Sequence, residues 1–346
     1  MEPKMKPRDK KGRKIRLIIK KLFSMRYSAC CISAITSAAL LQLPAFVSSC
    51  VMQETKSPAY IGQQIYIQCT KNPRLPELDC FFFHTEGARL LDSYQQIPVS
   101  GDGTVTGIST TGPRLLVVVS GSGENDWYGI RQYPDLCKLR FSLMDEDPGN
   151  PQMLGEVFLD DTPRREVKLS LRPALAQIRL RSVSADFSGY PYDGEPFVNT
   201  SVYLGNAVTE CLPLALDGVR PAALSWINTG DVDSVGVSRF PFPEMLLQEG
   251  IGPIGKEPCT VSREFYCYPG PDTRIVLVGR VGDDLCYYPV PLGTLLPGRS
   301  YELDVRLTRK GAPSPYMPVQ SGTVVAESTS FPWDWNEPLY LPLEYD

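Results

Sequence analysis

The chain has 346 residues, 42% of them hydrophobic and 21% charged, which is the composition of a folded protein with room for two ordinary domains. Its single histidine, His84, excludes most histidine-based catalytic and metal sites, because any such site would have to use that one residue. Residues 1–26 hold 11 of the 35 Lys and Arg and two of the 39 Asp and Glu, so the rest carries 24 basic against 37 acidic side chains, and this acidic body gives no support to nucleic-acid binding.

The N-terminus has the pattern of an export signal. After the basic head, residues 27–49 carry no charge, and small residues precede Cys50. This order predicts a lipoprotein signal peptide at residues 1–49, with Cys50 acylated as the mature N-terminus. An ordinary cleaved signal and a retained membrane span are the alternatives, and polar residues together with Pro44 weaken the second. Because the basic head is longer than a signal requires, residues 1–24 can be an over-extended start before Met25.

Export determines how the remaining cysteines are interpreted. Seven of the ten follow Cys50, and an odd number cannot all pair. Cys69 with Cys80, and Cys259 with Cys267, are spaced so that each pair could bridge adjacent strands, but neither spacing matches zinc ligands. The alternative is a small buried hydrophobic side chain, which is a common role of cysteine.

The first half of the body predicts short strands separated by turns. Alternating or continuous apolar runs bounded by Pro or Gly are found at residues 64–69, 78–83, 115–119 and 167–171. Only residues 126–141 suggest a short helix. Arg172-Pro173 predicts a domain boundary, because proline cannot donate to a strand ladder, which divides the body into residues 50–172 and 173–346.

The second half repeats the pattern. Strands are predicted at residues 177–183, 200–205, 274–281, 285–290, 301–307, 323–328 and 339–343. Many short strands with frequent turn signals favour an all-β protein of antiparallel sandwiches. Parallel pairing is not expected, since it would need intervening helices.

The side chains that could carry chemistry give weak signals. His84 is predicted as a strand-end residue, and the acidic clusters 145–147 and 160–161 as solvated loops, because they lack regular calcium-ligand spacing. Paired carboxylates of a glycosidase cannot be recognised in sequence, since their separation is a three-dimensional quantity. The aromatic run at residues 331–335 could stack on sugar rings or pack over a sandwich. No catalytic, cofactor-binding or metal-binding residue is predicted.

Several stretches together resemble the fimbrillin-like subunits of Bacteroidales type V pili. They are residues 78–83, 90–95, 178–189, 249–255, 265–269, 287–291 and 299–309. The resemblance implies a lipoprotein precursor with two transthyretin-like β-sandwich domains, exported to the outer membrane and assembled into an adhesive surface fibre. It implies no enzyme and no cofactor.

The resemblance also implies how subunits join. A cap strand, here residues 64–69, would be removed by cleavage after Lys71 or Arg74, and another subunit's C-terminal strand would take its place. The expected donor strand is formed by Thr323, Val324, Val325 and Ala326. Pro342 makes the later segment 339–343 a poorer donor, because it cannot donate to a ladder.

The resemblance thus implies a fimbrial structural or adhesive subunit at the cell surface. Its expected partners are other fimbrial subunits, the outer membrane through its lipid, and a host or bacterial surface ligand. A surface glycan-binding lipoprotein is the alternative. The sequence leaves stalk, tip and anchor roles open.

Overall fold

The computed structural model describes residues 63–69, 77–100, 104–109, 112–121, 127–160, 166–217, 219–227 and 237–333. The predicted signal peptide, Cys50, Lys71, Arg74 and residues 339–343 lie outside these ranges. In the described part, no helix has the length and apolar character needed to cross a membrane.

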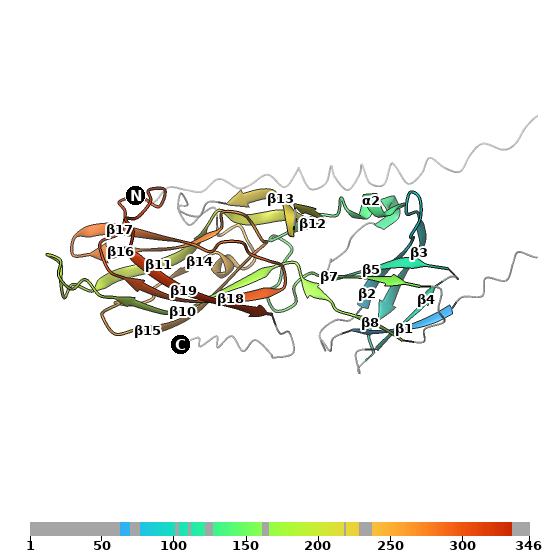
Figure 1. The fold of residues 1–346 in the computed structure, drawn as a ribbon, viewed down its shortest axis with the longest axis horizontal. Coiled ribbons are helices and arrows are strands. Elements are labelled where there is room, and N and C mark those ends of the chain that lie inside the picture. The colour runs from blue at the N-terminus through green and yellow to red at the C-terminus, as the bar shows by residue number, and fades with distance from the viewer. Residues whose placement is uncertain are drawn as a thin grey trace, which may run out of the picture. The chain divides into compact units, whose positions relative to one another are not determined.

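The prediction of an all-β protein is confirmed (Figure 1). The helical elements are short: η1 (Trp127–Gly129) and α2 (Tyr133–Leu136), both within the predicted helical segment, and η3 (Pro243–Met245). The strands are β1 (Gln63–Cys69), β2 (Glu77–His84), β3 (Leu91–Pro98), β4 (Thr104–Ser109), β5 (Arg114–Ser120), β6 (Phe141–Ser142), β7 (Met153–Leu159), β8 (Glu166–Leu169), β9 (Arg172–Pro173), β10 (Ala176–Ala185), β11 (Phe197–Gly205), β12 (Ala207–Asp217), β13 (Arg220–Ile227), β14 (Leu247–Glu249), β15 (Cys259–Cys267), β16 (Arg274–Val281), β17 (Asp284–Pro291), β18 (Arg299–Leu307) and β19 (Val324–Pro332).

Two sheets enclose a first hydrophobic cluster. One has the strand order β4-β1-β8 and the other β3-β2-β5-β7-β9. Alternate side chains of β2 and β5 point into the cluster, which therefore includes Phe82, Leu116 and Val118. The facing sheet contributes Val105 from β4 and Val167 from β8, so the two layers bury one shared apolar surface.

A second, larger cluster lies among the remaining sheets. Their strand orders are β15-β10-β18-β19, β14-β11-β16-β17 and β13-β12-β6. The cluster includes Ile178, Leu303 and Leu277, and it extends to Phe81 and Phe83 on the opposite face of β2. Residues on both sides of Arg172 thus contribute to it.

Two strand pairs are parallel, which differs from the purely antiparallel expectation. β10 pairs in parallel with β18, and β1 with β8. The chain between these partners runs through several other strands, most of which belong to other sheets, so the crossover does not need a helix. Local sequence patterns cannot reveal such long-range partners.

The predicted boundary at Arg172-Pro173 forms the short strand β9. It pairs antiparallel with the start of β7, Pro173 lying opposite Met153. The division into two domains at this point stays a prediction.

Among the cysteines of the described ranges, Cys137, Cys211, Cys259, Cys267 and Cys286 are free thiols. The interpretation that Cys259 and Cys267 bridge adjacent strands is wrong, because the two residues are the ends of the same strand, β15. Cys80, Cys211, Cys267 and Cys286 are buried, as expected of small hydrophobic side chains.

Candidate functional site: the two terminal strands

The first described strand, β1, is the middle strand of its sheet. It pairs antiparallel with β4, from Gln63 opposite Ser109 to Gln68 opposite Thr104. On its other edge it pairs in parallel with β8, from Tyr66 opposite Glu166 to Cys69 opposite Leu169. Because β1 is the ladder partner of both β4 and β8, its removal would leave two strands with unpaired backbone groups.

Apolar side chains flank the position of β1. Val105 of β4 and Val167 and Leu169 of β8 are buried members of the first cluster. A vacated β1 position would therefore expose both backbone hydrogen-bonding groups and apolar surface. A replacement strand could satisfy the first and cover the second.

The last described strand, β19, is an edge strand. It pairs with β18 alone, from Val324 opposite Leu307 to Pro332 opposite Arg299 (Figure 1). Val324 is partly buried and the other side chains of β19 are exposed, Val325 by 47%. The strand is thus held mainly by its backbone ladder and contributes little to the hydrophobic core.

The two ends of β19 are fixed more firmly than its middle. Thr323, just before the strand, is buried, and its carbonyl accepts a hydrogen bond from the Thr308 amide at 2.9 Å. Beyond the strand, the Trp333 amide donates to the Gly298 carbonyl at 2.9 Å, and the Trp333 ring lies 5.5 Å from that of Tyr266. Trp333, one residue of the aromatic run at 331–335, therefore packs against the protein's own side chains.

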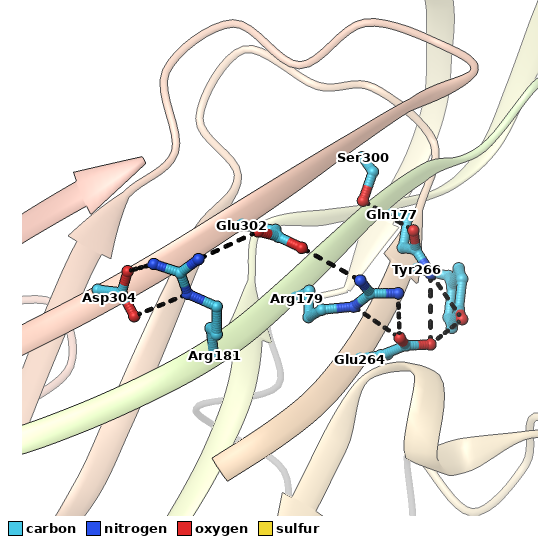
Figure 2. A network of polar contacts seen from close by, with 8 residues as sticks. All are labelled: Gln177, Arg179, Arg181, Glu264, Tyr266, Ser300, Glu302 and Asp304. Carbon is cyan, nitrogen blue, oxygen red and sulfur yellow. Dashed lines mark hydrogen bonds and ion pairs between the residues drawn. The ribbon is translucent and has the colours of Figure 1, made fainter. Parts of the chain in front are cut away.

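On the opposite edge of β18, charged side chains link three strands (Figure 2). The Arg179 Nη2 of β10 lies 2.7 Å from Glu264 Oε1 of β15, and its Nη1 lies 3.1 Å from Glu302 Oε1 of β18. Glu264 also accepts a hydrogen bond from the Tyr266 hydroxyl at 2.7 Å. Gln177 joins this end of the network, since its amide nitrogen lies 3.3 Å from both Glu264 and the Tyr266 oxygen.

The network continues along β10 and β18. Arg181 pairs with Asp304, which also accepts a hydrogen bond from Ser182, and Arg181 Nη1 lies 3.5 Å from Glu302 Oε2 (Figure 2). At the other end, Ser300 donates to Gln177 Oε1 at 2.8 Å. The hydrogen bond from Arg181 holds the pKa of Asp304 below its usual range.

A buried carboxyl group lies apart from this network. Glu146 is 1% exposed, and its two oxygens accept hydrogen bonds from the Tyr268 hydroxyl at 2.7 Å and from the backbone N–H of Gln152 at 3.0 Å. Burial raises the pKa of Glu146 to about 8, because low polarity disfavours the charged form. The interpretation of the cluster 145–147 as a solvated loop is therefore wrong at Glu146, which Tyr268 covers from a distant part of the sequence.

The other predicted residues are placed as follows. His84 ends β2, as expected, and its Nε2 lies 3.5 Å from Asp92 Oδ1. The expected donor residues Val324, Val325 and Ala326 lie in β19, and their partners are residues of the chain's own β18.

By sequence, the chain matches no family model, and no curated protein is significantly similar to it. Several solved structures share its fold. A proposed cell adhesion protein from Bacteroides eggerthii aligns with a TM-score of 0.58 at 18% identity, over 79% of this chain and 96% of that one. A proposed cell adhesion protein from Parabacteroides distasonis aligns with a TM-score of 0.55 at 12% identity, over 79% and 97%.

A fimbrilin from Porphyromonas gingivalis aligns with a TM-score of 0.53 at 12% identity, over 79% of this chain and 97% of the fimbrilin. The chain has the fold of a fimbrillin-like protein. At these identities the likeness establishes the fold, and the residues that would carry a function have to be argued from this chain itself.

Proposed function

We propose that this protein is a structural subunit of a cell-surface fimbrium, joined to its neighbours by strand exchange. The observation that carries the proposal is the position of β1, which pairs with both β4 and β8 beside buried apolar side chains. The fold shared with a fimbrilin and with proposed adhesion proteins supports the same role. This role is structural and requires no catalytic step.

Loss of β1 would create the acceptor site. Cleavage after Lys71 or Arg74, which follow β1 in the sequence, would free the strand from the rest of the chain. A strand from a second subunit would then restore both ladders and cover the apolar residues, each large side chain contributing about 1.5–3 kcal/mol on burial. Head-to-tail use of such a contact is heterologous and extends a filament instead of closing a ring.

The donor would come from the C-terminal segment. Thr323, Val324, Val325 and Ala326 belong to the described end of the chain, where β19 packs few side chains on its own protein. An edge strand with so little buried surface costs less to release than an interior strand. The exposed middle of β19 therefore supports its role as an exchangeable strand.

Truncation tests this proposal. A protein lacking residues 322–346 should be exported but should not enter fibres, as seen by electron microscopy. Because the deletion also removes the packed Trp333 ring, a cooperative unfolding transition serves as the check that the rest of the protein has folded. The substitution Ala326→Pro, which removes one backbone donor from β19, should shorten fibres while leaving the tail present. Fibres of normal length from both variants would eliminate the donor role.

The acceptor side has its own test. The double variant Lys71→Ala/Arg74→Ala should retain its first strand and remain monomeric, with the mass of the uncut chain. The matched double variant Lys256→Ala/Arg263→Ala changes two exposed basic residues outside β4, β8 and the predicted cleavage segment, and it should assemble normally. Normal fibres from the uncut protein would contradict removal of β1.

We further propose that Cys50 carries the lipid that attaches the precursor to the outer membrane, on the basis of the small residues before it. Cys50→Ala should abolish labelling by a fatty-acid analogue and release the protein from membranes. Cys137→Ala, which alters a thiol of the folded body, is the control and should label normally. Unchanged labelling of Cys50→Ala would exclude this anchor.

A further inference from the structure

A group of aromatic rings lies on the face of β2 and β3 that points away from the first hydrophobic cluster. Phe81 of β2 is fully buried, and Tyr94 lies opposite it on β3. The ring centroids of Tyr94 and Trp127 lie each 5.0 Å from that of Phe81 and 6.5 Å from each other. The planes of the Tyr94 and Trp127 rings are inclined by 46°. We call Phe81, Tyr94 and Trp127 the aromatic platform.

The platform keeps part of its aromatic surface in contact with solvent. Tyr94 is 38% exposed, Trp127 is partly buried, and the adjacent Tyr128 is 95% exposed. Large aromatic side chains are usually buried when they serve only the core. Three neighbouring aromatic residues with exposed surface therefore indicate a site of contact with another molecule.

Polar groups flank the platform on the same two strands. The Tyr94 hydroxyl donates to Asp79 Oδ1 at 2.6 Å, and the Gln96 amide donates to Glu77 Oε1 at 2.9 Å. Burial, together with the hydrogen bond to Asp79, raises the pKa of Tyr94. Alternation along β3 places Tyr94 and Gln96 on one face, and the amide of Gln96 there contacts the carboxylate of Glu77.

This combination matches the two surfaces of a sugar ring. The C–H groups of a pyranose carry a partial positive charge and attract the negative face of an aromatic ring. Its hydroxyl groups are donors and acceptors that pair with carboxylate and amide side chains. Few polar groups beside apolar rings are typical of sites for small neutral ligands.

We propose that the aromatic platform binds a carbohydrate, stacking it on Tyr94 and Trp127 and hydrogen-bonding its hydroxyl groups to Gln96 and Glu77. The hydrogen bond between Gln96 and Glu77 leaves capacity for a ligand, because a carboxylate accepts several hydrogen bonds and an amide carries a second N–H group and an acceptor oxygen. The site lies on β2, β3 and η1 and uses no residue of β1 or β19. Carbohydrate binding is thus independent of fibre assembly.

The test uses soluble protein that lacks only the predicted signal peptide, residues 1–49. It is applied to an array of mammalian, microbial and plant glycans. Affinity for each bound glycan is then measured by isothermal titration calorimetry, whose signal does not depend on Trp127. Trp127→Ala and Tyr94→Ala should each weaken binding about tenfold, and Tyr94→Phe should change it by less than about threefold because the ring is kept. Trp226→Ala is the matched control, since Trp226 is another exposed tryptophan, 65% exposed, on β13.

Thermal unfolding of each variant shows whether it is folded, so a loss of binding can be told apart from a loss of the fold. Should Tyr94→Ala unfold, Gln96→Ala and Trp127→Phe carry the test, and both should weaken binding. Absence of binding to every glycan overturns the proposal. Equal affinity of the wild type and the two alanine variants for a glycan also overturns it. Binding of an oligolysine peptide, the cationic probe, without binding of any glycan overturns it too.

Discussion

The two neighbours of β18 are held in very different ways. One face of the β10–β18 pair packs on the second hydrophobic cluster. The other face carries the network of Arg179, Arg181, Glu302 and Asp304. Toward β19, the backbone ladder is supplemented by Arg299, whose Nη2 donates to the carbonyl and hydroxyl oxygens of Ser330 at 3.1 and 3.2 Å. The same strand therefore has one interface built from buried side chains and one that depends on its backbone.

This difference indicates which strand can leave without loss of the fold. Releasing β10 would expose core side chains such as Ile178 and leave charged groups unpaired. Releasing β19 would break its ladder but expose little apolar surface. The proposed strand exchange requires this organisation, because the edge strand would be released while the core is kept.

The largest expected effect compares a core residue of β18 with its exposed counterpart on β19. Leu303 is buried, so Leu303→Ala should lower the free energy of unfolding by about 2–5 kcal/mol. Val325→Ala should change it by less than about 0.5 kcal/mol, because Val325 is 47% exposed. Urea unfolding of both variants measures the two values. Similar losses in the two would break the comparison.

A second prediction contrasts a carboxyl group whose pKa is lowered in the folded protein with one whose pKa is raised. Arginine pairing lowers the pKa of Asp304, whereas burial raises that of Glu146 to about 8. Because the pKa of Glu146 is higher in the folded protein than in the unfolded chain, its contribution to stability is fully present below pH 4.5. That contribution is lost as the pH rises through about 8. Asp145 and Asp147 add to the effect, since their negative charges also raise the pKa of Glu146.

Glu146→Gln removes this titration and keeps a hydrogen-bond acceptor for Tyr268. Between pH 4.5 and 8 the variant should gain stability relative to wild type by up to about 1.4 kcal/mol per pH unit. Glu327→Gln on exposed β19 should follow the wild-type curve. Parallel unfolding curves for Glu146→Gln and wild type across this range would show that Glu146 is not buried in its neutral form.

The smallest effect concerns the ion pairs themselves. Glu302→Gln weakens the contacts of Glu302 with both Arg179 and Arg181 and should cost about 1 kcal/mol, with a smaller cost in high salt. Glu327→Gln is the matched change on the other side of β18 and should shift stability by less than about 0.5 kcal/mol. Equal costs, or no dependence on salt, would remove the network as the source of the difference.

The sequence allowed the prediction of strands whose signal is local. β2, β5, β16 and β18 have apolar runs or clean alternation, so their positions were predicted to within a few residues. β3 was missed because Asp92, Ser93, Gln95 and Gln96 give it a polar composition, which an edge strand tolerates. β12 and β13 carry prolines and register shifts that interrupt the alternating pattern.

Long-range contacts explain the rest of the missed features. The strand that contains Arg179 was predicted, but its partner Glu264 lies 85 residues further along the chain. The burial of Glu146 depends on Tyr268, 122 residues away. Neither partnership leaves a signal in a local window, and both follow from the order of strands in the sheets.

Strand exchange is tested most directly by photo-crosslinking from β19. Fibres are assembled from a mixture of ¹⁴N-labelled and ¹⁵N-labelled subunits in which Val325, an exposed residue, is replaced by p-benzoylphenylalanine, and the crosslinked peptides are identified by mass spectrometry. The account predicts mixed-isotope adducts that join residue 325 of one subunit to β4 or β8 of another. Adducts confined to β18 of the same subunit would contradict it.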